Sequence, residues 1–304
     1  MLRSVRCLKE LLKLSKSSTK ITKKQVTLAP FMMSTKHGSD HLERTSNEER
    51  TNPEYSEAEV IELNDMSPTV KRLLLKVNDQ SFIFKAGQWV DFYIHDPTVQ
   101  IVGGYSISSE PFQFLYNRVL ELAVKFSKYP PAFWTHTQCQ IGNKVSLRVG
   151  GTQIIYDPQP SDPHYNVLLI AGGIGINPLL SMIRHANSLK RAQTHWFSPV
   201  RFQLLYSAST RKELIFQDDI SEIVNNFPSV FQSTLFVTQE DVSSDNKYTQ
   251  GRIQDSHLAS AVQEFGSENL ECYICGPPPM IEDMESSLLK LNMKPENVHY
   301  EKWW

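Results

Sequence analysis

Residues 163–304 alternate between two kinds of apolar segment. Short runs dense in Val, Leu and Ile, such as Val167–Ala171, are typical of strands buried on both faces of a sheet. Longer stretches between them, such as Pro178–Leu189, place apolar residues at helical spacing. This alternation predicts a parallel sheet covered by helices, with ligands bound at the carboxyl ends of its strands. The remaining expected elements are strands at Phe202–Ser207, Ser233–Thr238 and Cys272–Cys275, and helices at Glu213–Asn225, Asp255–Phe265 and Pro279–Leu291.

Residues 55–162 show a different pattern, in which short strand-like segments are separated by turn-forming residues and no long helical stretch intervenes. Several short strands at regular spacing predict an antiparallel barrel of the Greek-key type. A proline-rich stretch, Asp157–Pro163, marks a hinge between the two domains. The expected fold is therefore a β-barrel followed by a parallel-sheet α/β domain. The expected barrel strands are Ala58–Leu63, Val70–Val77, Trp89–Ile94, Tyr105–Ser109, Leu120–Lys125 and Lys144–Val149.

Residues 1–54 precede both domains and differ from them in charge. Residues 1–39 contain nine Lys or Arg against a single acid, Glu10, and are rich in Ser and Thr. Four apolar residues recur there at helical spacing: Leu2, Val5, Leu8 and Leu12. A basic amphipathic leader is typical of a mitochondrial presequence, so we expect a mitochondrial protein. The alternatives are an unstructured basic tail and a secretory signal, whose apolar run the lysines at positions 9 and 13 would interrupt. Residues 35–55 are predicted to form a flexible connector.

The rest of the chain is acidic. Of the 31 basic and 33 acidic side chains, 22 and 32 fall in residues 40–304, which gives a net charge of −10. Such a body binds nucleic acid poorly, because neutralisation of phosphates dominates that affinity. No apolar run approaches the roughly 18–20 residues that span a bilayer, so no transmembrane segment is expected.

Three cysteines lie outside the leader: Cys139, Cys272 and Cys275. They are too few for a disulfide framework. The C-x-x-C spacing of Cys272 and Cys275 suggests a metal or dithiol site, but both fall in an expected buried strand, where positions i and i+3 face opposite sides. No second pair and no histidine cluster accompanies them in the sequence, so no metal site is expected.

The strongest motif is a glycine-rich stretch, AGGIGINP, which begins at the end of the expected strand Val167–Ala171. Its glycines, Gly172, Gly173 and Gly175, are expected to adopt positive φ and to let the backbone approach a ligand. Asn177 is a candidate N-cap, and the proline after it suits a first helical turn. The free amides and the positive helix end would then face a pyrophosphate. The alternative is a tight strand–helix turn without a ligand.

Two further stretches follow this loop, Tyr206–Phe216 (YSASTRKELIF) and Tyr273–Met280 (YICGPPPM). Together and in this order, the motifs resemble the ferredoxin–NADP reductase superfamily, and especially its cytochrome-b5 reductase and nitrate reductase branch. The resemblance covers residues 55–304. It implies an oxidoreductase that transfers hydride between NAD(P)H and a flavin at an interdomain cleft. No iron–sulfur cysteine set and no haem domain is evident in the sequence, so the electron acceptor would be a separate, unidentified molecule.

In the nicotinamide half, the resemblance implies that the backbone from Gly172 to Asn177, including Ile174 and Ile176, cradles the NAD(P) pyrophosphate. Cys275 would hold the nicotinamide ring near the flavin. The small residue after it, Gly276, and then Pro277 would leave room for that ring and shape the turn.

The resemblance places Ser209 and Arg211 at the positions that contact the adenosine ribose of the dinucleotide in the family. They would accept a 2′-phosphate, and no acid at the strand end visibly excludes one. Arg211 and Lys212 fit the solvated start of a helix equally well. The expected dinucleotide is NAD, with NADP as the alternative.

In the barrel, the stretch GGYSISS from Gly103 aligns with the family's Arg-x-Tyr-Ser sequence. Tyr105 would stack on the flavin, and the Ser106 hydroxyl would donate toward its N5 atom. Gly103 replaces the family's phosphate-binding Arg, and the second phosphate loop is replaced by Pro130–Ala132. Without the charged hydrogen bond of that Arg, flavin binding weakens by roughly 1.5–3 kcal/mol, or about 10- to 150-fold in affinity.

The resemblance thus implies a weakly held FAD, with FMN as the alternative. Three cations are candidates to replace the missing charge: Arg118, Lys125 and Lys128. Trp304 or Trp303 would cover the other flavin face, or dock with a last strand. The alternative function is a non-catalytic NAD(H) sensor or assembly module with a degenerate flavin site.

Overall fold

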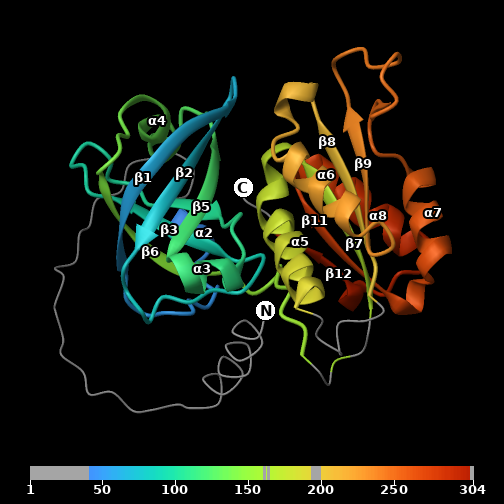
Figure 1. Ribbon diagram of the computed structural model, residues 1–304, viewed down its shortest axis with the longest axis horizontal. Helices are drawn as coiled ribbons and strands as arrows, with labels where there is room; N and C mark the ends of the chain where they lie inside the picture. The colour runs from blue at the N-terminus through green and yellow to red at the C-terminus, as the bar shows by residue number, and fades with distance from the viewer. Residues whose placement is uncertain (1–40, 160–161, 163–164, 193–199, 302–304) are drawn as a thin grey trace.

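The computed structural model describes residues 41–159, 162, 165–192 and 200–301. These residues form two sheets of six strands each, one antiparallel and one parallel. Figure 1 shows the two sheets as separate bodies lying side by side. The expected β-barrel followed by an α/β domain is confirmed.

The antiparallel sheet has the strand order β4-β3-β6-β1-β2-β5. Just beyond β4, Ile107 pairs with Leu122 of β5, which joins the two outer strands and closes the barrel. Inward-facing side chains such as Leu73, Phe92 and Leu147 form its apolar core. The strands are β1 (Ser56–Ser67), β2 (Val70–Val77), β3 (Trp89–Ile94), β4 (Gly103–Ser106), β5 (Val119–Lys125) and β6 (Lys144–Gly150).

Two short helices interrupt the barrel where no helix was expected: α3 (Pro111–Asn117) and α4 (Pro130–Thr137). Each begins at a proline, which lacks an N–H and therefore fits the first helical turn, where that N–H has no partner. Both helices are short, in keeping with the absence of a long helical stretch from the sequence, and their prolines start helices instead of marking turns.

The segment before the barrel packs against it. It contains the helix α2 (His41–Arg44), and the side chain of His41 is buried. Arg50 forms an isolated bridge with Gly150, and its guanidinium binds Asp91. The predicted flexible connector is therefore wrong for residues 41–55, because His41 and Arg50 hold the segment to Asp91 of the barrel.

The parallel sheet has the strand order β10-β9-β8-β7-β11-β12. The chain starts at β7 in the middle, builds outward through β8 and β9, and then returns to the other side of β7 with β11. Ligand crevices form at such a reversal of strand order. The strands are β7 (Asn166–Gly172), β8 (Phe202–Ala208), β9 (Phe231–Val237), β10 (Tyr248–Gln250), β11 (Leu270–Cys275) and β12 (Val298–Tyr300).

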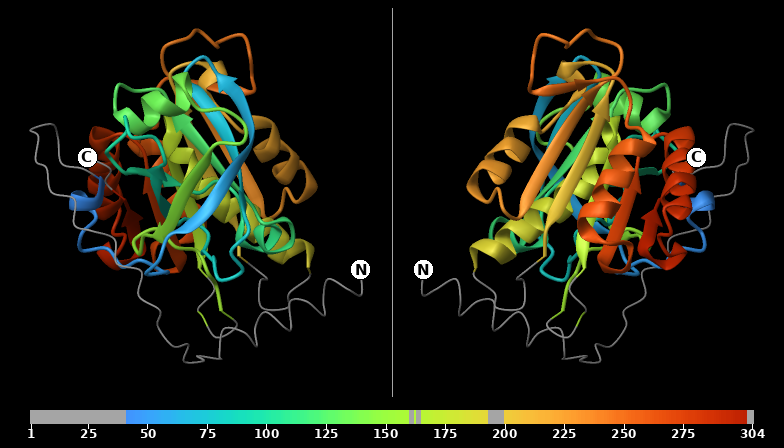
Figure 2. Two further views of the ribbon diagram at one scale, coloured as in Figure 1. Left: turned by 90° about the vertical axis from the view of Figure 1, so that its left-hand side faces the viewer. Right: turned by 90° about the vertical axis from the view of Figure 1, so that its right-hand side faces the viewer.

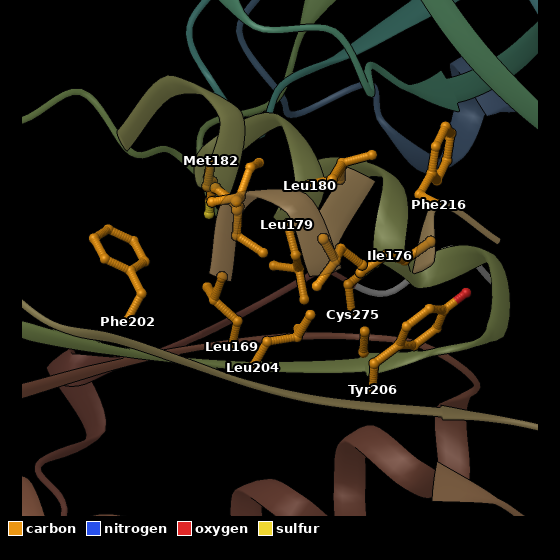
Figure 3. Close-up of a cluster of buried hydrophobic side chains, with 14 of the residues drawn as sticks. Leu169, Ile176, Leu179, Leu180, Met182, Phe202, Leu204, Tyr206, Phe216 and Cys275 are labelled. Carbon is orange, nitrogen blue, oxygen red and sulfur yellow. The ribbon is translucent and has the colours of Figure 1, made fainter. Parts of the chain in front are cut away.

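Helices cover both faces of this sheet: α5 (Ile176–Arg191), α6 (Gln217–Asn226), α7 (Asp255–Phe265) and α8 (Pro278–Lys290). Figures 1 and 2 show α5 and α6 on one face and α7 and α8 on the other. Figure 3 shows Leu179 and Ile176 of α5 lying over Leu169 and Leu204 of the strands. Cys275 belongs to this core, whereas Cys272 belongs to the core on the opposite face, which confirms the predicted geometry of the C-x-x-C pair.

One expected helix is divided. The segment predicted as a single helix over Glu213–Asn225 consists of a 3₁₀ turn, η3 (Arg211–Glu213), followed by α6. The break lies at Phe216, whose φ of 62° is left-handed and cannot continue a helix. Among the described residues, no helix is both long enough and apolar enough to cross a membrane.

Candidate functional site

The site lies where β7 and β11 end side by side. The two strands are paired in parallel up to Ala171 and Cys275, so the loops that follow them leave the sheet together. The first loop is a 3₁₀ turn, η1 (Gly173–Gly175), which leads directly into α5. The amides of this turn and the positive end of a 16-residue helix therefore open into the crevice.

Two of the three glycines are required by close packing, not by backbone conformation. A Cβ on Gly175 would lie 2.2 Å from the carbonyl oxygen of Cys275, and one on Gly172 would lie 2.8 Å from the Cδ of Pro277. Only Gly173 has a positive φ, 54°, and the space around it is open. The expectation of positive φ is thus wrong for Gly172 and Gly175, which instead bring the two loops into contact.

Asn177 is not an N-cap. It lies inside α5, and its Nδ2 donates a 2.8 Å hydrogen bond to the carbonyl of Ala123 in β5. Its buried Oδ1 has no hydrogen-bond partner within the described chain. The N-cap prediction is therefore wrong, because this amide links the nucleotide loop to the barrel and leaves one acceptor for a ligand.

A cavity of about 540 Å³ joins the two domains at this point. Its lining includes Tyr105 and Ser106 from β4 and Lys125 from β5. From the α/β domain it includes Gly172, Gly173, Ile174, Gly175, Asn177, Cys275, Gly276 and Pro277. Most of the site residues expected from the sequence therefore meet in one space.

Four expected site residues lie elsewhere or contribute differently, and one of them, Arg211, is described below. The side chain of Ile176 is buried in the core under α5, so only its backbone is available to a ligand (Figure 3). Ser209 is exposed near the end of β8, outside the lining of this cavity. Trp304, like Trp303, lies outside the described residues.

Tyr105 and Ser106 point to opposite faces of β4, as strand alternation requires. The ring of Tyr105 packs edge-on against Phe92 at 5.4 Å, and its buried hydroxyl has no partner among the described groups. Burial raises the pKa of this phenol, so it stays neutral. Ser106 faces outward on β4, opposite Trp89 of β3, and is one of the residues that line the cavity.

The cysteine of the second loop is neutral as well. Burial, reinforced by the Glu301 carboxylate, raises the pKa of the Cys275 thiol. A neutral, polarisable sulfur packs well against a planar ring and is a poor nucleophile. The geometry thus favours a positioning role for Cys275.

Glu301 is a site residue that sequence reasoning missed. Its Oε1 accepts a 2.6 Å hydrogen bond from Nε1 of Trp89, and its Oε2 has no partner in the described part of the chain. Burial raises the pKa of this carboxyl to about 8, so it holds a proton at neutral pH close to Cys275. The sequence offered little signal, because Glu301 is followed by Lys302 and reads as one half of an exposed charge pair beside the tryptophans.

Arg211 forms a salt bridge with an acid. Glu240, which follows β9, accepts hydrogen bonds from both the backbone N–H and the Nε of Arg211, at 2.9 and 2.6 Å. The expectation that no acid opposes a 2′-phosphate is therefore wrong, because the acid comes from the neighbouring strand. A carboxylate at this position repels a phosphate and favours the ribose hydroxyls of NAD.

At the barrel end of the cavity, β4 carries no Arg, and the candidate replacement cations are placed differently from one another. Lys125 lines the cavity, with its Nζ 3.9 Å from Glu213. Arg118 does not replace the missing charge, because its guanidinium lies over Phe114 and donates to the carbonyl of Phe82. A second cation, Arg44 of α2, lines the cavity and was not anticipated.

These contacts test which cofactors the residues fit. The open Gly173, the first amides of α5 and the orphaned Oδ1 of Asn177 fit a dinucleotide. The Ser106 hydroxyl and the neutral Cys275 sulfur fit a flat ring system lying between the domains. The phosphate of a flavin nucleotide requires a cation other than the missing one on β4.

Comparison with known proteins supports this geometry. Residues 169–286 match the family described as the oxidoreductase NAD-binding domain. The chain is 43% identical over 279 residues to the Danio rerio oxidoreductase NAD-binding domain-containing protein 1, covering 90% of this chain and 100% of that protein. It is 42% identical over 290 residues to the Homo sapiens protein of the same name, covering 93% and 90%.

A solved structure extends the likeness to the fold. A ferredoxin NADP⁺ reductase from Neisseria gonorrhoeae with bound FAD and NADP aligns at a TM-score of 0.66 and 19% identity, covering 83% of this chain and 100% of that one. The resemblance to ferredoxin–NADP reductases suggested by the motifs is confirmed at the level of fold.

Proposed function

Since the chain belongs to the family of oxidoreductase NAD-binding domain-containing proteins, we propose that it transfers hydride from NADH to a flavin and passes the electrons to a separate acceptor. A general oxidoreductase role follows from the family. The flavin, the preference for NADH and the two-step transfer are our proposal. The observation that carries it is the single cavity in which Ser106 of the barrel meets Cys275 and the glycine-rich loop.

The residues of the chain have distinct tasks in this scheme. The amides from Gly173 onward and the positive end of α5 bind the dinucleotide diphosphate. Cys275 and Gly276 give the nicotinamide a flat apolar seat, and the cavity wall opposite holds the flavin at Ser106. Hydride transfer depends on proximity and orientation, which these fixed contacts supply.

When bound, the flavin supplies the chemistry, because it accepts a hydride and releases electrons singly or as a pair. The chain controls protons and water around it. Ser106 offers a hydroxyl donor, and Glu301 holds a proton beside Cys275 because the pKa of its buried carboxyl is about 8. The buried Trp89 fixes that carboxyl through its indole N–H.

The proposal is tested by the visible spectrum of the purified protein with FAD or FMN added. We expect a flavin band that bleaches on addition of NADH. Ser106→Ala should slow the bleaching while NADH affinity stays unchanged, because the hydroxyl acts at the flavin and not at the diphosphate. Absence of NADH uptake by folded protein, measured by calorimetry, would overturn the proposal.

A second candidate function is a non-catalytic NAD(H) sensor or assembly module. It is favoured by one observation, the replacement of both flavin-phosphate contacts by Gly103 and by the first turn of α4. NADH binding without uptake of any flavin would favour it over the reductase.

We propose in addition that the protein acts in mitochondria. The support is the composition of residues 1–39, with nine basic side chains, one acid and abundant Ser and Thr. Import of the full chain into isolated mitochondria tests this, with replacement of the leader arginines by glutamine as the control that should abolish uptake. Efficient import of that control would contradict the proposal.

A further inference from the structure

The outer face of β3 and β4 carries an unusual arrangement beside the flavin end of the cavity. On this face Asp91 lies opposite Gly104, and Trp89 lies opposite Ser106. The imidazole of His41 fills the space above Gly104, where an added Cβ would lie 2.2 Å from its Nδ1. The second glycine of the GGYS stretch is therefore required by a side chain from the N-terminal segment. The strand that lacks the phosphate-binding Arg is also the strand on which this segment lies.

His41 is held firmly in this position. It is 1% exposed, its Nε2 lies 2.9 Å from Oδ1 of Asp91, and its ring packs edge-on against Trp89 at 4.8 Å. Asp91 is fully buried and also binds Arg50 and Arg148, at 2.9 and 2.8 Å. Burial opposes ionisation, but hydrogen bonds from His41, Arg50 and Arg148 lower the pKa of Asp91 to about 2. The carboxylate is thus charged and anchors the segment throughout the physiological range.

The anchor positions the residues that follow His41. Thr45 donates its hydroxyl to the carbonyl of His41 at 2.8 Å, and the guanidinium of Arg50 donates to the carbonyl and the hydroxyl of Thr45 at 2.8 and 2.7 Å. Arg44 lies between these two fixed points and lines the cavity with Ser106 and Lys125. Arg44 is therefore held at the cavity by the same segment that fills the space over β4.

We propose that Arg44, together with Lys125, binds the phosphate of the flavin nucleotide in place of the Arg that β4 lacks. The inference rests on the proposed function and adds to it the residues that recognise the nucleotide part of the cofactor. Both cations line the same cavity, which suits a doubly charged phosphate, and a guanidinium forms paired hydrogen bonds to phosphate oxygens. The strand carries no Arg, and the N-terminal segment brings one to the same space.

The opposite role for this segment is a plug that keeps flavin out. The two roles predict opposite changes in flavin affinity when the segment is released. If the segment binds the phosphate, releasing it weakens flavin-nucleotide binding. If it blocks the cavity, releasing it strengthens binding of every flavin.

The test compares riboflavin, FMN and FAD by equilibrium quenching of flavin fluorescence on the full-length protein. Arg44→Ala should weaken FMN and FAD binding about tenfold and leave riboflavin, which has no phosphate, unchanged. Arg252→Ala is the matched control, because it removes an exposed guanidinium of the α/β domain that is not part of the cavity lining. Equal affinities of the Arg44 variant and the unmodified protein for FMN would overturn the inference.

His41→Ala provides the second measurement, because it removes the contact that holds α2 to the barrel while Arg50 and Arg148 still neutralise Asp91. We expect weaker FMN binding, whereas stronger binding of FMN and riboflavin alike would establish the plug. NADH affinity, measured on the same samples, reports folding of the site. Absence of flavin uptake by the unmodified protein would overturn both the proposed function and this inference. Flavin uptake that is insensitive to the phosphate overturns the inference alone.

Discussion

Substitution of Gly175 by alanine tests how the two loops of the site are built. Gly175 has an ordinary helical φ of −63°, so alanine introduces no backbone strain there. The new Cβ would lie 2.2 Å from the carbonyl oxygen of Cys275, whereas real Cβ contacts are essentially never shorter than 3.0 Å. Because the obstacle is backbone, the two loops have to separate by about 0.8 Å, the difference between these two distances.

Two consequences follow from that separation. Overpacking of this kind costs about 1–3 kcal/mol, which lowers Tm by roughly 3–10 °C in a chain of this size. A displacement near 1 Å between the reacting groups slows hydride transfer by about a hundredfold. Thermal unfolding and stopped-flow flavin reduction by NADH measure the two effects. The matched control is Gly142→Ala, at an exposed turn with φ 91° and open space, which should cost only about 1–2 kcal/mol and leave the reaction rate unchanged.

The rate and the stability of the two glycine variants decide whether the loop contact matters. If Gly175→Ala reduced flavin at the unmodified rate, the close contact with Cys275 would not position the nicotinamide seat. A slower rate without a fall in stability would show that the loops separate freely. A slower rate in the Gly142 variant as well would point to a general folding defect.

Three further predictions address charge. Glu301→Gln should remove a fall in stability that urea unfolding detects between pH 4.5 and 8. Because the folded-state pKa of this carboxyl is raised, its contribution to stability is fully present below the unfolded-state pKa of 4.5 and is lost as the pH rises to the folded-state pKa of about 8. Glu240→Gln should improve the KM for NADPH about fivefold by freeing the arginine that it binds. Arg184→Ala should cost about 3 kcal/mol in urea unfolding, since it leaves the buried Glu121 with one cation fewer, whereas Arg201→Ala, at an exposed pair, should cost under about 0.5 kcal/mol.

The sequence predicted the elements whose pattern is local. Trp89–Ile94 and Asp255–Phe265 have the bounds expected from alternation and from helical spacing. The nucleotide loop also lies where expected, because a buried strand followed by glycines and a helix is encoded in contiguous residues. The same holds for the second loop after Cys275.

Features that depend on distant residues escaped prediction. No pattern in residues 41–55 indicates that His41 is buried, because its partner Asp91 lies 50 positions away. The acid beside Arg211 comes from the end of another strand. The break at Phe216 is a backbone conformation that apolar periodicity does not register. In the first two cases the deciding contact is tertiary.

The hydrogen bond from Asn177 to Ala123 has a mechanical consequence. It crosses the domain boundary and joins α5, which follows the glycine-rich loop, to β5, which lines the same cavity. Sliding of one domain over the other would break this buried amide contact. If the proposed reaction takes place here, the contact would set the spacing between the two walls of the cavity.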